Sequence, residues 1–136
     1  MKPKTFEEAE ALEGIAYTKP ENPTALEQWY STVRTMKFSD LTVEDLCKCL
    51  RQGVHVELLI DHALWILGND INAGELYEGE LLKSFQDVAT EFWTKNPGEK
   101  ARLIEIVRKN ETTAADEDVK TIVGHLLARM GSDSDD

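Results

Sequence analysis

Basic residues are scarce in this chain. Its 136 residues include 15 Lys and Arg against 26 Asp and Glu, so the formal net charge is −11. Nucleic acids and anionic membranes attract proteins that present a cationic surface, and an acidic chain lacks that attraction. We therefore expect no nucleic acid and no membrane as a direct partner. The charge instead favours a basic protein partner, because complementary charge accelerates association.

Long apolar runs are also missing, and cysteines are few. No stretch reaches the roughly 20 apolar residues that a membrane span needs, and the N-terminal residues lack the apolar core of a signal peptide. We therefore expect a cytoplasmic protein. Cys47 and Cys49 lie in a predicted helix, where their side chains point about 200° apart and cannot form a disulfide with each other. We expect two reduced thiols, one buried and one partly exposed.

The cysteines and histidines do not form a zinc-binding pattern. Zinc needs ligands that converge on one point, and Cys47 and Cys49 diverge. His55 and His62 are separated by roughly 10.5 Å along a helix axis, which is too far for one ion. We therefore expect no metal.

Patterns for calcium, cofactors and catalysis are incomplete or missing. The segment Asn69–Glu80 has the length of an EF-hand loop, with Gly and Glu at the expected positions. Its third and fifth residues, Ile71 and Ala73, offer no side-chain oxygen, so two main ligands are lost. Neither a glycine-rich phosphate loop nor a nucleophile elbow is present. We expect no cofactor and no enzyme activity.

Helix start and stop signals recur along the chain. Asn22-Pro23 and Asn96-Pro97 each combine a cap residue with proline at the first helical position. Thr42 and Asp45 have the spacing of a capping box, and Gly53 is typical of a helix end. Apolar residues repeat at helical spacing, and no period-2 strand pattern is present. The expected helices cover about residues 6–13, 23–35, 43–52, 54–67, 97–107 and 116–130. A further helix is expected to begin at about residue 81, with Phe92-Trp93 near its end or just beyond it.

These segments predict an all-α fold. We expect a compact single-domain bundle of about six or seven helices over residues 1–130. Residues 131–136 are small or acidic and carry no apolar side chain. We expect a disordered acidic tail there.

The distribution of charge is the most informative feature. No Lys or Arg lies between Arg51 and Lys83. Two acids of this interval stand four residues apart on one helix, where like charges repel. A partner that supplies cations would relieve this repulsion, although a solvated face is the plain alternative. Trp65 and Tyr77 lie in the same interval and could be interface anchors or core residues. The acids are Glu57, Asp61, Asp70, Glu75, Glu78 and Glu80.

Several short motifs follow one another in a recognisable order. Thr42-Val43-Glu44-Asp45-Leu46 opens a helix, residues 74–82 read Gly-Glu-Leu-Tyr-Glu-Gly-Glu-Leu-Leu, and Phe92-Trp93 follows. This order, from about residue 5 to residue 107, resembles the immunity proteins of contact-dependent growth inhibition (CDI) systems. Two positions where proline is common in that family hold acids here, Asp61 and Glu78.

The resemblance implies a cytoplasmic antidote that binds the C-terminal toxin domain of a large secreted protein. Such domains are often nucleases, and we favour a ribonuclease. The six acids of the interval would then occlude its basic active-site cleft. We expect a monomer that forms a 1:1 heterodimer with the toxin domain, without a cofactor.

Other interpretations stay open at this point. The chain could be an acidic nucleic-acid mimic that regulates another basic protein, or a small helical enzyme. Within residues 74–82 we interpret Tyr77 as a core residue. We interpret Gly79 as a point of close approach to the following helix.

Overall fold

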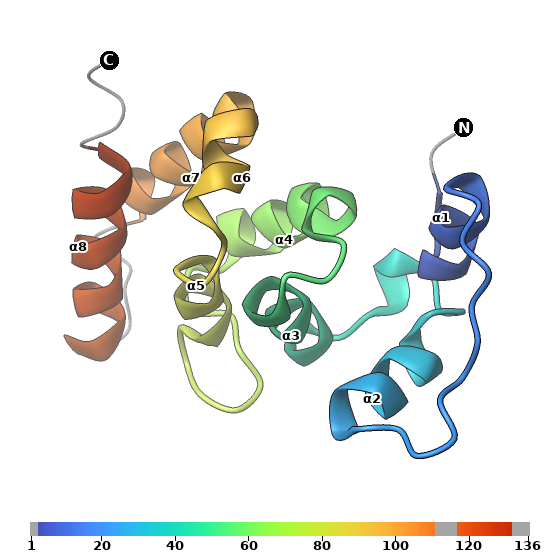
Figure 1. The fold of residues 1–136 in the computed structure, drawn as a ribbon. Helices are drawn as coiled ribbons and strands as arrows, with labels where there is room; N and C mark the ends of the chain where they lie inside the picture. The colour runs from blue at the N-terminus through green and yellow to red at the C-terminus, as the bar shows by residue number, and fades with distance from the viewer. Residues whose placement is uncertain (1–2, 111–116, 132–136) are drawn as a thin grey trace. The chain divides into compact units, whose positions relative to one another are not determined.

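The fold is known from a computed structural model, which describes residues 3–110 and 117–131, without the side chain of Met130. Within these residues the chain forms eight α-helices and one 3-10 helix, and no strand (Figure 1). The elements are α1 (Phe6–Leu12), α2 (Ala25–Val33), η1 (Phe38–Asp40), α3 (Val43–Gln52), α4 (Val56–Asn69), α5 (Glu80–Phe85), α6 (Thr90–Lys95), α7 (Pro97–Lys109) and α8 (Glu117–Gly131). The all-α prediction is confirmed. There is one helix more than expected, because the segment after Gly79 forms two short helices.

The chain divides into two units, Met1–Leu41 and Thr42–Asp136. The single domain expected over residues 1–130 stays a prediction. The acidic tail expected at residues 131–136 lies outside the described residues, except for Gly131, the last residue of α8. None of the described helices is long and apolar enough to cross a membrane.

Unit 1 closes around an aromatic cluster and a buried ion pair. The ring of Phe6 is fully buried, with its centroid 5.5 Å from that of Tyr30 and 5.1 Å from that of Phe38. The buried carboxylate of Glu10 pairs with Arg34 and accepts a 2.5 Å hydrogen bond from the Tyr30 hydroxyl. Burial and this hydrogen bond raise the pKa of Tyr30. A buried charge is tolerated only with such partners, so these contacts fix α1 against α2.

The start of α2 differs from the prediction. The N-cap is Thr24 and not Asn22. The Thr24 hydroxyl accepts from the Glu27 amide at 3.1 Å, and the Glu27 carboxylate accepts from the Thr24 amide at 2.9 Å. This capping box satisfies two amide groups at once, which explains why the helix begins two residues later than Pro23 suggested.

In unit 2, α3 begins and ends as the sequence predicts, and α7 begins at the predicted proline. Thr42 and Asp45 form the expected capping box, and Gly53 ends α3 in the left-handed conformation at φ 69°. Pro97 occupies the first turn of α7. The Asn96 side chain, however, makes no cap bond to α7 and donates instead to the carbonyl of Phe92 at 2.9 Å.

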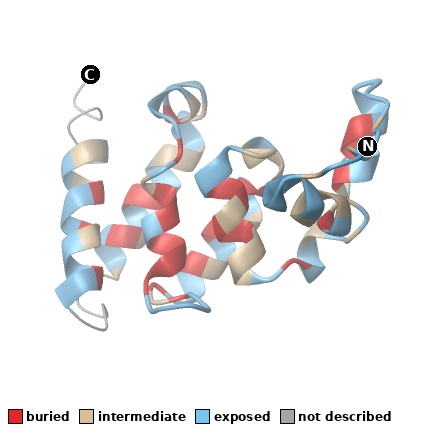
Figure 2. Cartoon of the chain, turned by 60° about the horizontal axis from the view of Figure 1, so that its bottom comes forward, coloured by how far each residue is buried: buried red, intermediate tan, exposed pale blue. Residues whose placement is uncertain are grey.

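The core of unit 2 lies between its helices, with α3 against α5 and α7 against both α4 and α8. Figure 2 shows buried residues concentrated on the helices in the middle of this unit, whereas α8 is largely exposed. Cys47 and Cys49 are both fully buried and free. The expectation of one partly exposed thiol is therefore wrong, because α3 is covered on more than one side. The largest fully buried core residues of unit 2 are Leu46, Leu50, Leu59, Leu64, Leu67, Leu81, Leu82, Phe85, Trp93, Leu103 and Leu126.

Candidate interaction surface

The six acids singled out in the sequence do not share one environment. Glu57 and Asp61 are exposed on α4. Asp70, Glu75 and Glu78 are exposed in the α4–α5 loop, residues 70–79. Glu80 opens α5 and is fully buried. The structure therefore brings five carboxylates to the surface in two groups, one on α4 and one on the loop. Glu80 belongs to neither group.

The buried carboxylate of Glu80 holds the α4–α5 loop. Its Oε1 atom accepts hydrogen bonds from the amides of Glu75 at 3.0 Å and Leu76 at 3.2 Å. Its Oε2 atom lies 3.7 Å from Nη1 of Arg51. A carboxylate in the interior is stable only when such donors compensate its lost hydration. Glu80 therefore positions the loop that carries the exposed acids.

Two glycines explain why the loop can take this path. A Cβ atom on Gly74 would lie 2.1 Å from the carbonyl oxygen of Tyr77. Gly79 has φ +85°, and a Cβ atom there would lie 2.8 Å from Val119 of α8. Both positions need the absence of a side chain. The close approach expected at Gly79 is present, but the neighbouring helix is α8 and not α5.

Tyr77 does not fill the core. Its side chain is 46% exposed, and the neighbouring Leu76 is 68% exposed. The interpretation of Tyr77 as a core residue is therefore wrong. The physical reason is that Glu80 fixes the loop through its backbone amides, so the loop does not need an apolar plug. Both apolar side chains are left at the tip of the loop.

The loop is also tied to α3. The carboxylate of Glu75 accepts a 2.6 Å hydrogen bond from the amide of Glu44, in the first turn of α3. Helix N-termini favour such negative groups. At the other end of the loop, the Asp70 carboxylate accepts from the amide of Asn72 at 3.0 Å. Glu75 and Asp70 thus stabilise the loop while their side chains stay exposed.

The acids on α4 have cationic or titratable neighbours. Arg102 of α7 places Nη1 3.4 Å from Oδ1 of Asp61. His55 places Nδ1 4.0 Å from Oε1 of Glu57. The ion pair with Arg102 therefore partly offsets the repulsion expected between Glu57 and Asp61. Arg102 stands far from the acids in sequence, so only the packing of α7 against α4 could reveal it.

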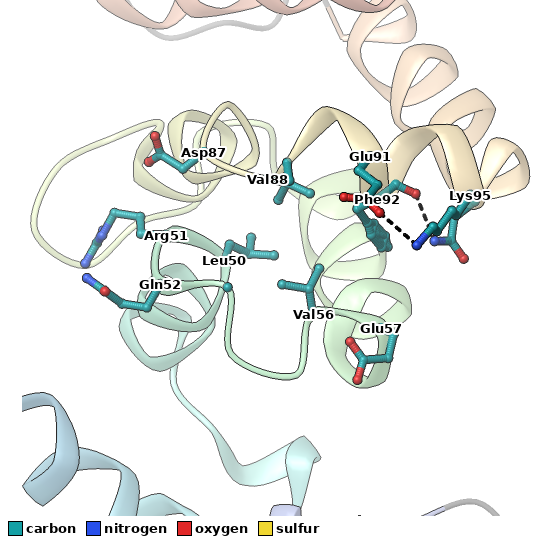
Figure 3. A pocket seen from close by; sticks show the side chains of 13 residues that line it. Leu50, Arg51, Gln52, Val56, Glu57, Asp87, Val88, Glu91, Phe92 and Lys95 are labelled. Atoms are coloured by element: carbon teal, nitrogen blue, oxygen red, sulfur yellow. Dashed lines mark hydrogen bonds and ion pairs between the residues drawn. The ribbon is translucent and has the colours of Figure 1, made fainter.

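A groove of about 600 Å³ lies between the end of α3, the start of α4 and α6 (Figure 3). Leu50, Val56 and Val88 face its middle, and charged side chains surround them. The charges are of both signs and include the Glu91–Lys95 pair, with its atoms 2.9 Å apart. This mixture shows no preference for a charged ligand. Over the described part of the chain, no three His, Cys, Asp or Glu residues are grouped to hold a metal ion.

A family model described as CDI immunity proteins matches residues 11–103, which is more than half of the chain. The matched stretch includes α2 to α6 and therefore all six acids singled out in the sequence. No curated protein matches the chain.

Proposed function

The chain belongs to the CDI immunity proteins, and from this membership we propose how it neutralises its CDI toxin. The proposed partner is the C-terminal toxin domain of a large secreted protein, a nuclease and in particular a ribonuclease. The protein binds this domain in the cytoplasm, as a monomer that forms a 1:1 heterodimer. It contributes no chemistry, because steric occlusion of the substrate site is sufficient for inhibition.

The observation that supports this proposal is that five carboxylates, two on α4 and three on the α4–α5 loop, are exposed in a stretch of sequence without Lys or Arg. A nuclease cleft is basic, since it must hold phosphate groups. Carboxylates at the surface of an inhibitor can occupy the positions of those phosphates and pair with the same cations. The proposed contact residues are Glu57, Asp61, Asp70, Glu75 and Glu78.

The first test is binding. The probe is the C-terminal domain of the large secreted protein encoded next to this chain, purified and titrated with the immunity protein. A variant with all five carboxylates neutralised, Asp to Asn and Glu to Gln, should bind at least about tenfold more weakly and protect cells less. The control neutralises five other exposed acids and removes the same charge: Glu8, Glu13, Glu21, Asp40 and Glu105. Equal affinity of the two variants would contradict the proposed contact residues.

The second test concerns the mechanism. Cleavage of RNA by the toxin domain is measured at several RNA concentrations, with and without the immunity protein. Occlusion of the active site predicts inhibition that a higher RNA concentration relieves. Inhibition that is independent of RNA concentration would show that the protein acts from a distance. A toxin domain that leaves both RNA and DNA intact would exclude the nuclease.

A further inference from the structure

The tip of the α4–α5 loop carries an exposed apolar pair on a backbone that is held in place. We propose that Leu76 and Tyr77 form the apolar anchor of the toxin-binding surface and insert into an apolar recess with a cationic rim on the toxin domain. This inference rests on the proposed function, because the occupant is the toxin domain. It adds the residues that carry most of the affinity.

The exposure of the pair is the first argument. Leu76 is 68% exposed and Tyr77 is 46% exposed, and they are adjacent in the loop. Exposed apolar side chains that lie singly are normal on protein surfaces, whereas neighbouring ones often mark an interaction site. Tyr is also enriched among the residues that dominate binding energies.

The rigidity of the loop is the second argument. The amides of Glu75 and Leu76 both donate to the buried carboxylate of Glu80. Hydrogen bonds from Gly79 to Asn72 and from Leu81 to Ala73, both at 3.0 Å, close the base of the loop. A segment that is fixed before binding loses little conformational entropy when it binds. Binding of a partner to the two apolar side chains therefore costs little conformational entropy in the loop.

The acids next to the apolar pair favour a basic partner. The carboxylates of Glu75 and Glu78 flank the pair, and Glu44 lies next to Glu75 through the hydrogen bond to its amide. Tyr77 and Glu78 also line a groove of about 520 Å³ together with Asp118 of α8. Lys83 and His125 line the same groove, and Nζ of Lys83 lies 6.0 Å from the centroid of the Tyr77 ring. It is therefore the exposed carboxylates of Glu75 and Glu78 beside the apolar pair that favour a cationic rim on the partner.

Two other features of unit 2 give weaker support for an anchor site. Trp65 is 61% exposed, but no other large apolar residue of α4 is exposed beside it. Its ring is stacked on that of His62, with the ring centroids 6.3 Å apart. The apolar residues of the groove of Figure 3, Leu50, Val56 and Val88, are buried or half-buried. Neither combines an apolar pair, acids and a fixed backbone, which the loop tip does.

The test compares single variants in binding to the purified toxin domain. Leu76→Ser and Tyr77→Ser should each weaken binding by at least about tenfold, whereas Tyr77→Phe, which keeps the ring, should bind within about twofold of wild type. The matched control is Leu12→Ser, because Leu12 is 65% exposed and lies in unit 1. Circular dichroism and melting temperature should be unchanged in all four variants, since the side chains are exposed.

The outcomes separate this inference from the proposed function. If the wild-type protein does not bind the toxin domain, both fail. If wild type binds and the Leu76 and Tyr77 variants bind equally well, the anchor is wrong while the proposed function stands. Trp65→Ser is included in the series. A loss of affinity in this variant alone would overturn the inference and move the anchor to α4.

Discussion

Buried carboxylates have structural roles at two points of the chain. Glu10 holds Tyr30 and Arg34 in unit 1, and Glu80 holds the amides of the α4–α5 loop in unit 2. Leaving such a charge without its donors costs several kcal/mol. These two acids therefore contribute to the fold, although the sequence gives them no mark that distinguishes them from the exposed acids.

The buried thiols give a prediction at the same scale. Burial raises the pKa of Cys47 to about 11 and that of Cys49 to about 12, from an ordinary value of 9.0. We expect neither thiol to react with a thiol reagent at pH 8 in the folded protein, and both to react after denaturation. Rapid labelling of the folded protein would contradict the burial of α3.

The same pKa values predict how stability depends on pH. Unfolded thiols lose their protons near pH 9, whereas the folded protein retains them until about pH 11 to 12. The raised pKa values of the two thiols therefore contribute fully to the free energy of unfolding below pH 9, and this contribution is lost as pH rises toward 12. Denaturation curves at a series of pH values measure this effect. A Cys49→Ala variant should show a shallower fall in unfolding free energy over this range than wild type.

At the scale of elements, the α4–α5 loop is as well defined as the helices beside it. Three residues determine the backbone conformation of the loop. Gly74 and Gly79 do so by lacking a side chain, and Glu80 does so through its carboxylate. The loop also contacts α3 through Glu75 and approaches α8 at Val119. Residues 74–79 therefore belong to the packed structure of unit 2, and the side chains of Leu76 and Tyr77 at the tip are exposed.

Substitution of Gly79 tests this element. Gly79→Ala places a Cβ atom 2.8 Å from Val119 on a backbone with φ +85°, so we expect a loss of about 1–3 kcal/mol in unfolding free energy. In a Val119→Ala background the loss should be smaller, because the steric part is removed. Gly98→Ala is the control, since a Cβ atom there meets nothing within 4 Å. Chemical denaturation measures all variants, and equal losses at Gly79 and Gly98 would contradict the close approach.

At the scale of the whole molecule, the net charge of −11 acts on association. Opposite charges steer two proteins together. Salt weakens this attraction, and at 0.1 M it largely screens charges that are more than about 10 Å apart. We expect the association rate with the toxin domain to fall at least about tenfold between low salt and 0.5 M. The dissociation rate should change much less, because the proposed anchor is apolar. Stopped-flow kinetics measures both rates, and an association rate independent of salt would contradict electrostatic steering.

The signals that the sequence carries act over a few residues. The capping box of Thr42, the left-handed Gly53 and the first-turn Pro97 are local, and the structure has all three. The helical class follows from them and from the apolar periodicity. Even the error at α2 was local, because a second cap residue, Thr24, stands two positions after Asn22.

What the sequence determined by itself is thus the helical class, most helix ends, the excess of acid and the order of motifs that points to the immunity family. Tertiary structure alone decided which acids face outward. Arg102 reaches Asp61 across 41 residues and Glu75 reaches the amide of Glu44 across 31. Such pairs form only when helices pack, since a side chain's burial depends on what folds over it. For that reason Glu80 lies inside and Tyr77 outside, the reverse of what their residue types suggest.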